Sequence, residues 1–199
     1  MLTVGKDGAE VERRLAGGQL ECPGCGGQLH GWGHARVREI RLGGVARRRL
    51  RPRRAICGGC GRTHVLLPAG MLARRADSAA VIGEALMLAA SGLGCATIAR
   101  RLGRAAATVR GWLRRFAARA GRLRSAFTAL ACALDPDPPL PGPAGSPLAD
   151  AVAAIGGAAT AAARRWSAVS AWELAAAVTS GSLLSPGWDG RAGNTSCLW

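Results

Sequence analysis

The sequence contains no tyrosine and only two phenylalanines in 199 residues. Proteins that bind single-stranded nucleic acid without sequence preference stack the bases on aromatic side chains, so a surface of that kind is not expected. Long hydrophobic runs are also missing. The longest uncharged stretches, Ala85–Ala99 and Leu174–Trp188, are interrupted by glycine or proline and are shorter than the ~18–20 apolar residues that cross a membrane. We therefore expect no membrane span.

A secretory signal is missing as well, because the first residues, MLTVGKDGAEVERR, contain no apolar segment. The sequence therefore predicts a cytoplasmic protein, whose thiols stay reduced. In that compartment its seven cysteines are expected to be metal ligands or small apolar residues rather than disulfides. Cys95, Cys132 and Cys197 are isolated along the chain, and we interpret them as packing residues or incidental thiols.

Acidic residues are scarce: 12 of them stand against 27 basic residues, which gives a formal net charge of +15. Such a field attracts polyanions, and nucleic acid is the first partner to consider. Residues 21–75 carry a net charge of +10 and residues 76–134 carry +7, whereas residues 1–20 are neutral and residues 135–199 carry −2. Nucleic-acid binding is therefore assigned to residues 21–134, and with it a location at the nucleoid.

Four of the cysteines form two matching pairs. Cys22 and Cys25 belong to CPGCGG, and Cys57 and Cys60 belong to CGGCG. The C-x2-C spacing lets two thiolates of one tight turn bind one ion, and two such turns complete a tetrahedral four-sulfur site. The pattern therefore predicts one structural Zn²⁺. Two redox-active C-x-x-C motifs are the alternative, although redox motifs do not come paired and flanked by glycine.

The segments around the cysteines have the composition of strands: Gln28–Ile40, then Val45–Ile56 after a Gly43-Gly44 turn, then His64–Leu67. Because side chains alternate along a continuous strand, four arginines would share one face: Arg47, Arg49, Arg51 and Arg53. We interpret this row as a contact for phosphates. A charged edge that prevents pairing with other strands is the alternative.

The histidines are not expected to be ligands. His30 and His34 have a ligand-like spacing, but four cysteines already complete the coordination of one ion. Both are therefore assigned to the surface of the hairpin. His64 is assigned either to the strand itself or to a DNA phosphate.

After Pro68 the hydrophobic pattern changes to the helical period. Asp77 or Ser78 is expected to cap a helix that ends near Ala90. A short helix that begins at Cys95 is followed by Gly103, at a tight turn that needs a positive φ. The next helix carries its apolar residues at positions i, i+3, i+4 and i+7, which are Val109, Trp112, Leu113 and Phe116.

The residues from Cys95 onward resemble the helix-turn-helix of bacterial DNA-binding proteins and of transposase N-terminal regions. Ala99 stands where a small residue lets two helices cross, and Gly103 stands at the turn. The resemblance implies that the second helix enters the major groove, with Arg110 as the base contact. The outward positions assigned to the DNA on this helix are Ala106, Ala107, Arg110 and Arg114. Thr108 and Arg104 are expected near phosphates. Three helices of an ordinary core with a solvated arginine face are the alternative.

The longer pattern of CPGCGG, CGGCGRTHVLLP and GRAAATVRGWLRRF resembles an uncharacterised actinobacterial family of zinc-ribbon and helix-turn-helix proteins. That family is itself similar to the N-terminal DNA-binding region of insertion-sequence transposases. A transposase also needs three separated carboxylates that hold two metal ions. Residues 135–199 contain few acidic residues and no strand pattern, so we expect that the chain is not an enzyme.

The C-terminal third is rich in alanine. Residues 121–134 are expected to form an amphipathic helix that packs on the preceding helices or on a second copy. A homodimer through this helix or through the C-terminal helices is therefore one option. A further helix is expected over residues 146–166, and Ser170 with Glu173 forms a capping box that begins the last one.

The sequence therefore predicts a mainly α protein with a small β zinc ribbon, followed by a helix-turn-helix bundle and a C-terminal helical pair. Its expected divisions are an N-terminal arm (1–20), the zinc ribbon (21–68), the helix-turn-helix domain (69–134), a proline-rich linker (135–147) and an alanine-rich helical tail (148–199). The end of this tail, Gly187–Trp199, is expected to be disordered. The predicted function is non-catalytic binding of double-stranded DNA. The alternatives are an RNA-binding zinc-ribbon protein and a thiol redox enzyme.

Overall fold

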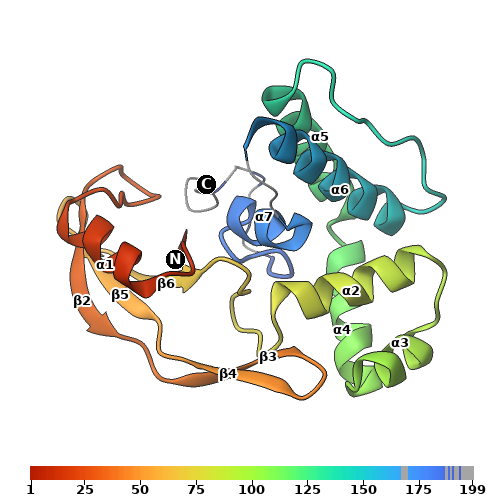
Figure 1. Ribbon diagram of the computed structural model, residues 1–199, viewed down its shortest axis with the longest axis horizontal. Helices are drawn as coiled ribbons and strands as arrows, with labels where there is room; N and C mark the ends of the chain where they lie inside the picture. Colours follow the sequence, from red (N-terminus) through yellow and green to blue (C-terminus); the bar gives the residue numbers. More distant parts are fainter. Residues whose placement is uncertain (167–169, 187, 189, 191–192, 194–199) are drawn as a thin grey trace.

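The computed structural model describes residues 1–166, 170–186, 188, 190 and 193. These residues form a β-rich part, which contains the first helix, and a helical part beside it (Figure 1). The strands are β1 (Leu2–Val4), β2 (Leu29–His34), β3 (Arg38–Gly43), β4 (Ala46–Leu50), β5 (Arg53–Cys57) and β6 (Thr63–Pro68). The helices are α1 (Gly8–Ala16), α2 (Ala79–Ala90), α3 (Cys95–Leu102), α4 (Ala106–Ala117), α5 (Ala120–Leu134), α6 (Pro147–Arg165) and α7 (Ala171–Val178). The prediction of a mainly α chain with a small β part is confirmed.

Two predictions concern the end of the chain. The disordered end was predicted for Gly187–Trp199, of which only residues 188, 190 and 193 are described, and Cys197 lies outside the described residues. None of the helices in the described part of the chain is long and apolar enough to cross a membrane.

A four-stranded sheet in the order β1-β6-β5-β2 holds the β-rich part together. β1 runs parallel to β6, with Leu2 opposite Leu66, and the other neighbours are antiparallel. β3 and β4 form a separate hairpin that extends away from the sheet (Figure 1). Val11 and Leu15 of α1 lie in one apolar core with Leu29 and Leu66 of the sheet.

The N-terminal arm predicted for residues 1–20 is made of β1 and α1. Leu2 and Val4 are buried, and the Asp7 carboxylate caps α1 by accepting the Ala9 N–H at 2.9 Å. Val11 and Leu15 have the i, i+4 spacing of a helix. The segment is short and carries no net charge, and it was therefore assigned to an arm. The first residues of the chain therefore belong to the core of the β-rich part.

The prediction of one strand over Val45–Ile56 is also wrong. Proline has no N–H to donate to a ladder, and Pro52 stands in the interruption between β4 and β5, which belong to different sheets. The expected strand Gln28–Ile40 is divided in the same way into β2 and β3. The segment between β2 and β3 lies beside the segment between β4 and β5, since the Ala35 N–H donates to the Pro52 carbonyl at 2.8 Å. The row of arginines is therefore split between two sheets.

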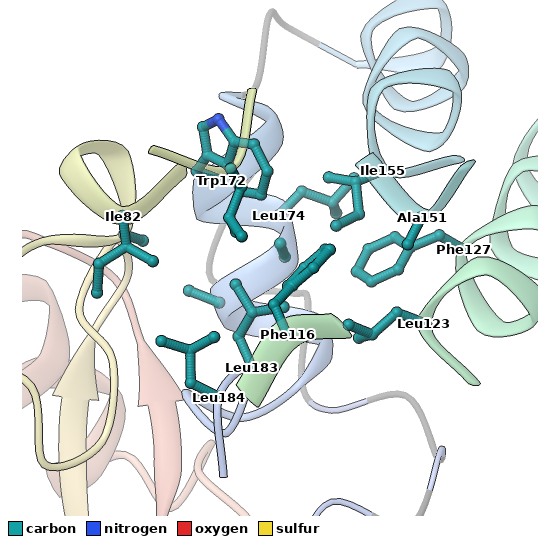
Figure 2. Close-up of a cluster of buried hydrophobic side chains, with 14 of the residues drawn as sticks. Ile82, Phe116, Leu123, Phe127, Ala151, Ile155, Trp172, Leu174, Leu183 and Leu184 are labelled. Carbon is teal, nitrogen blue, oxygen red and sulfur yellow. The ribbon is translucent and has the colours of Figure 1, made fainter. Parts of the chain in front are cut away.

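The helical part has a core of its own, to which every helix from α2 to α7 contributes. Both phenylalanines of the chain, Phe116 of α4 and Phe127 of α5, point into it (Figure 2). Ile155 of α6 and Leu183 reach the same cluster from the C-terminal third. The C-terminal helices therefore complete the core around α4 rather than forming a separate tail.

The apolar face of α5 is used inside the chain. Leu123, Phe127 and Ala131 of this helix are buried, and α5 lies alongside α6 (Figure 1). Residues 135–147 connect these helices, with Asp135 bound to Arg164 of α6 at 2.7 Å. Of the two options predicted for residues 121–134, packing on other helices of the chain is the one seen here.

Serines begin two of the helices as expected. Ser78 Oγ accepts the Val81 N–H at 3.3 Å, and Ser146 Oγ accepts the Ala149 N–H at 3.2 Å. The capping box predicted at Ser170 does not form, because its side chain makes no cap hydrogen bond. The Glu173 carboxylate binds Lys6 at 2.7 Å instead, which connects α7 to the N-terminal segment.

Gly83 of α2 lies directly under the buried indole of Trp172 of α7, and a Cβ at this position would overlap the ring. We expect Gly83→Ala to lower the free energy of unfolding by about 1–3 kcal/mol, because neither helix can shift freely. Gly156→Ala is the matched control, since Gly156 is also helical but has no neighbour within 4 Å of a Cβ. The control should raise stability by up to about 1 kcal/mol. Urea unfolding of both variants tests this, and equal effects would contradict it.

Candidate metal centre and basic interface

Two turns at one end of the ribbon bring the four paired cysteines together. Their sulfurs all lie within 4.8 Å of one another, and they form no disulfide. Cys22 Sγ is 3.8 Å from Cys60 Sγ, and Cys25 Sγ is 3.4 Å from Cys57 Sγ. A zinc ion with Zn–S bonds of about 2.3 Å places its four sulfurs about 3.8 Å apart. The cluster is therefore spaced to hold one tetrahedral metal ion.

The glycine after each second cysteine shapes these turns. Gly26 and Gly61 have φ values of +72° and +69°, which residues with a side chain rarely adopt. Their N–H groups close the turns by donating to the carbonyls of Cys22 and Cys57 at 2.9 and 3.0 Å. Cys57 Sγ also faces backbone donors, the N–H of Gly59 at 3.3 Å and that of Cys60 at 3.4 Å. The turns therefore present backbone N–H groups to a sulfur that carries negative charge.

The pKa values of the thiols reflect this arrangement. The backbone N–H of Cys60 and the neighbouring thiols lower the pKa of Cys57 to about 7, and the N–H of Gly24 is the main cause of the lowered pKa of Cys22. At Cys25 the N–H of Gly27 also lowers the pKa, but the thiols of Cys57 and Cys60 outweigh it and raise the pKa to about 12. Four adjacent thiols cannot all ionise without a cation, and a divalent metal ion removes this conflict.

His64 lies against the metal centre, although the sequence did not identify it as a partner of the cysteines. It is buried on β6, with Nε2 at 3.4 Å from Cys22 Sγ and Nδ1 at 3.1 Å from the Met1 amino group. Burial, followed by the nearby amino terminus, lowers the pKa of its ring, so the neutral imidazole is favoured. His30 and His34 lie on exposed positions of β2, as expected.

The hairpin arginines are not one continuous row. Arg47, Arg49 and Arg51 are exposed, and Arg47 binds Glu39 across the hairpin at 2.8 Å. Arg53 begins β5 in the other sheet, where its side chain is 24% exposed, binds Glu12 of α1 at 2.7 Å and donates to the Gly33 carbonyl. The assignment of Arg53 to the same face as the other three is therefore wrong, because Pro52 ends the strand between them.

The two helices around Gly103 lie where the sequence placed them. Gly103 adopts φ 62° and ψ 42°, the left-handed turn. Val109, Trp112 and Phe116 are buried in the core. The positions assigned to DNA on α4 point to solvent, with Thr108 half-buried and the others exposed: Ala106, Ala107, Arg110 and Arg114.

Arg104 departs from the prediction of a phosphate contact. Its side chain is only 7% exposed, and its Nε donates to Asp77 at 2.6 Å. The same guanidinium donates to the carbonyls of Leu102 and Gly103 at 3.1 Å. A guanidinium that is buried and paired in this way is withdrawn from the surface, so Arg104 supports the turn from inside.

Asp77 receives a second arginine, Arg41 of β3, at 3.1 Å. Two backbone bonds accompany it: the Arg41 N–H donates to the Ala76 carbonyl at 2.7 Å, and the Ser78 N–H donates to the Arg41 carbonyl at 3.0 Å. The β3–β4 hairpin is thereby attached to the start of α2, and in Figure 1 it runs along the edge of the molecule toward α3. Asp77 joins the hairpin to the turn that precedes α4.

Comparison with protein families finds one match, which begins at Cys22 and ends just after α4. A domain of unknown function (DUF6431) is found over residues 22–118. This range contains the four cysteines, the hairpin and Asp77, whereas α1 and the helices α5, α6 and α7 lie outside it. No curated protein and no solved structure matches the chain.

The pairing of Asp77 inside the DUF6431 domain can be tested by substitution. Asp77→Asn should lower the free energy of unfolding by about 3 kcal/mol or more, because it leaves the buried Arg104 guanidinium without a counter-charge. Glu39→Gln removes the acid of an exposed pair and should cost less than about 1 kcal/mol. Urea denaturation measures both, and a cost for Asp77→Asn as small as that of the control would show that the pair is not important.

Proposed function

We propose that this chain binds double-stranded DNA without catalysing a reaction, as a transcriptional regulator or as an accessory protein of a mobile element. In this proposal α3 and α4 are a helix-turn-helix, and α4 enters the major groove with Arg110 as the base contact. The observation that carries it is that two exposed arginine-bearing elements, α4 and the β3–β4 hairpin, are joined at one buried carboxylate, Asp77. The chain then acts at the nucleoid.

The exposed face of α4 favours DNA over RNA as the partner. The major groove of B-form DNA admits an α-helix, whereas that of A-form RNA is too deep and narrow for side chains to read. The first turns of α4 are exposed and carry small residues, Ala106 and Ala107, which allow close approach to a groove. Competition between duplex DNA and structured RNA tests this, and preference for RNA would overturn the proposal.

The metal in this proposal is one structural zinc ion held by Cys22, Cys25, Cys57 and Cys60. Four thiolates fill a tetrahedral shell and leave no position for a substrate, as in structural rather than catalytic zinc sites. The ion would compensate the charge of the thiolates and hold the two turns together, which argues against a redox role for either C-x-x-C pair.

Purified protein should contain about one equivalent of zinc. Cys57→Ser should lose the metal and unfold the ribbon, because structural zinc contributes folding free energy directly. Cys132→Ser is the control, since Cys132 lies exposed on α5, and it should keep the zinc. Acid should release the ion, because the thiolates must be deprotonated to bind it. Elemental analysis and circular dichroism measure these effects, and folded protein without zinc would refute the assignment.

Substitution of Arg110 and substitution of a hairpin arginine should impair DNA binding in different ways. Arg110→Ala should cost about 1–3 kcal/mol on the preferred DNA site and relax specificity at one base pair. Arg49→Ala should weaken binding to all sequences alike and lower the salt slope by about 1, because phosphate contacts carry no sequence information. Binding isotherms on a site selected from a random pool and on a scrambled duplex, across salt, measure both. If Arg49→Ala erases discrimination while Arg110→Ala does not, the two roles are reversed.

A further inference from the structure

An open cleft separates the tip of the β3–β4 hairpin from the α3–α4 turn. It has a volume of about 580 Å³, with Gly43, Gly44 and Arg47 on the hairpin side and Arg100, Arg101 and Gly103 on the other. The base of the cleft is formed by α2, where Val81 lies close enough to meet a Cβ at Gly43 at 3.9 Å. The walls come from segments far apart in the sequence, so no local pattern reveals the cleft.

The walls of the cleft are strongly basic. Arg100 and Arg101 are exposed, and neither has an ion-pair partner among the described residues. Arg47, which also binds Glu39, lines the cleft from the hairpin, and Glu84 is the one carboxylate among the described residues that line the space. Like charges that face each other across a cleft concentrate their field within it, so a bound anion would be favoured there.

The width of the cleft is set by Asp77, because both walls are attached to it. Arg41 ties the hairpin side to this carboxylate, and Arg104 ties the turn side. Gly44, with φ +49°, turns the chain at the tip, and the exposed Val45 next to it lines the opening. The cleft is thus a preformed space between two fixed backbones.

The location of the cleft identifies the anion. The wall that contains Arg100, Arg101 and Gly103 leads directly into the first turn of α4, the part of the helix that the proposed function places in the major groove. A sugar-phosphate strand borders the groove that such a helix occupies, so the anion expected beside it is a phosphodiester.

We propose that this cleft holds a phosphodiester segment of the DNA backbone next to the groove occupied by α4, with Arg47, Arg100 and Arg101 as its contacts. The inference rests on the proposed function and adds to it two residues, Arg100 and Arg101, that lie on the supporting helix. It also states that the hairpin and α4 bind one DNA molecule in fixed register.

The experiment compares the full-length protein with the double variant Arg100→Ala/Arg101→Ala and with Arg47→Ala. Arg124→Ala is the charge-matched control, because Arg124 is exposed on α5, on the opposite side of the molecule from the hairpin (Figure 1). Affinity for the selected duplex is measured between 50 and 200 mM salt. The affinity of the wild type falls by a certain factor between 50 and 200 mM salt. Loss of one phosphate contact should reduce this factor about threefold, and loss of two contacts in the double variant should reduce it about tenfold. The control should follow the wild type.

A second measurement locates the contact. Single phosphates of the duplex are replaced one at a time by neutral methylphosphonates. We expect one or two adjacent positions beside the Arg110 base pair to weaken the wild type and the control, but not the double variant. In Arg47→Ala, methylphosphonates should lose their effect at the same phosphates as in the double variant, because both walls would contact one segment of the backbone.

The outcomes separate the two proposals. If Arg110→Ala still lowers discrimination while the double variant binds with an unchanged salt slope, α4 binds DNA but the cleft does not. If Arg47 and the double variant affect phosphates in different places, the walls do not share one segment and the inference is wrong. If the wild type has no affinity for duplex DNA, the proposed function fails, and the cleft proposal fails with it.

Discussion

The buried carboxylate of Asp77 determines how the basic surfaces of this protein are arranged. It is 3% exposed and lies between Arg104 at 2.6 Å and Arg41 at 3.1 Å. Breaking a buried pair leaves an uncompensated charge in the interior, which is far more costly than losing a surface pair. The hairpin and the turn before α4 therefore keep one relative position. Without this carboxylate, the arginines of the two elements would form two independent patches.

The proposed metal centre is also part of the packing of the β-rich part. Cys22 and Cys57 belong to the same small apolar core as Leu29 and Leu66, so two of the four candidate ligands are packing residues as well. A core of this size supplies little stability alone, and small domains commonly add a structural metal. Ile40 of β3 lies in a neighbouring cluster with Leu67, the next residue of β6, which anchors the base of the hairpin. Loss of the metal would therefore also loosen the hairpin that approaches α3.

Local patterns predicted much of this structure. The cysteine spacing, the helix boundaries near Ala90 and the left-handed turn at Gly103 all depend on a few adjacent residues. Predictions failed where a partner distant in the sequence decides where a side chain points. Arg104 turns inward because Asp77 lies near it in space. Arg53 binds Glu12 of α1, a segment expected to be an arm. The contact of His64 with Cys22 spans 42 residues. Charge and periodicity cannot identify such pairs, because nothing in the sequence around either residue indicates its distant partner.

The C-terminal third carries no excess of positive charge, yet it contributes to the orientation of α4. Phe116, near the end of α4, is buried among Phe127, Ile155 and Leu183 of the later segments (Figure 2). Most of the buried residues of α6 and half of those of α7 are alanines, whose small side chains let these helices approach the cluster closely. The helix is thus held at its beginning through Arg104 and Asp77 and at its end through Phe116. A helix that presents Arg110 to a base edge needs a fixed axis as well as exposed side chains. The neutral C-terminal helices therefore serve the proposed DNA binding by fixing that axis, even though they provide none of its contacts.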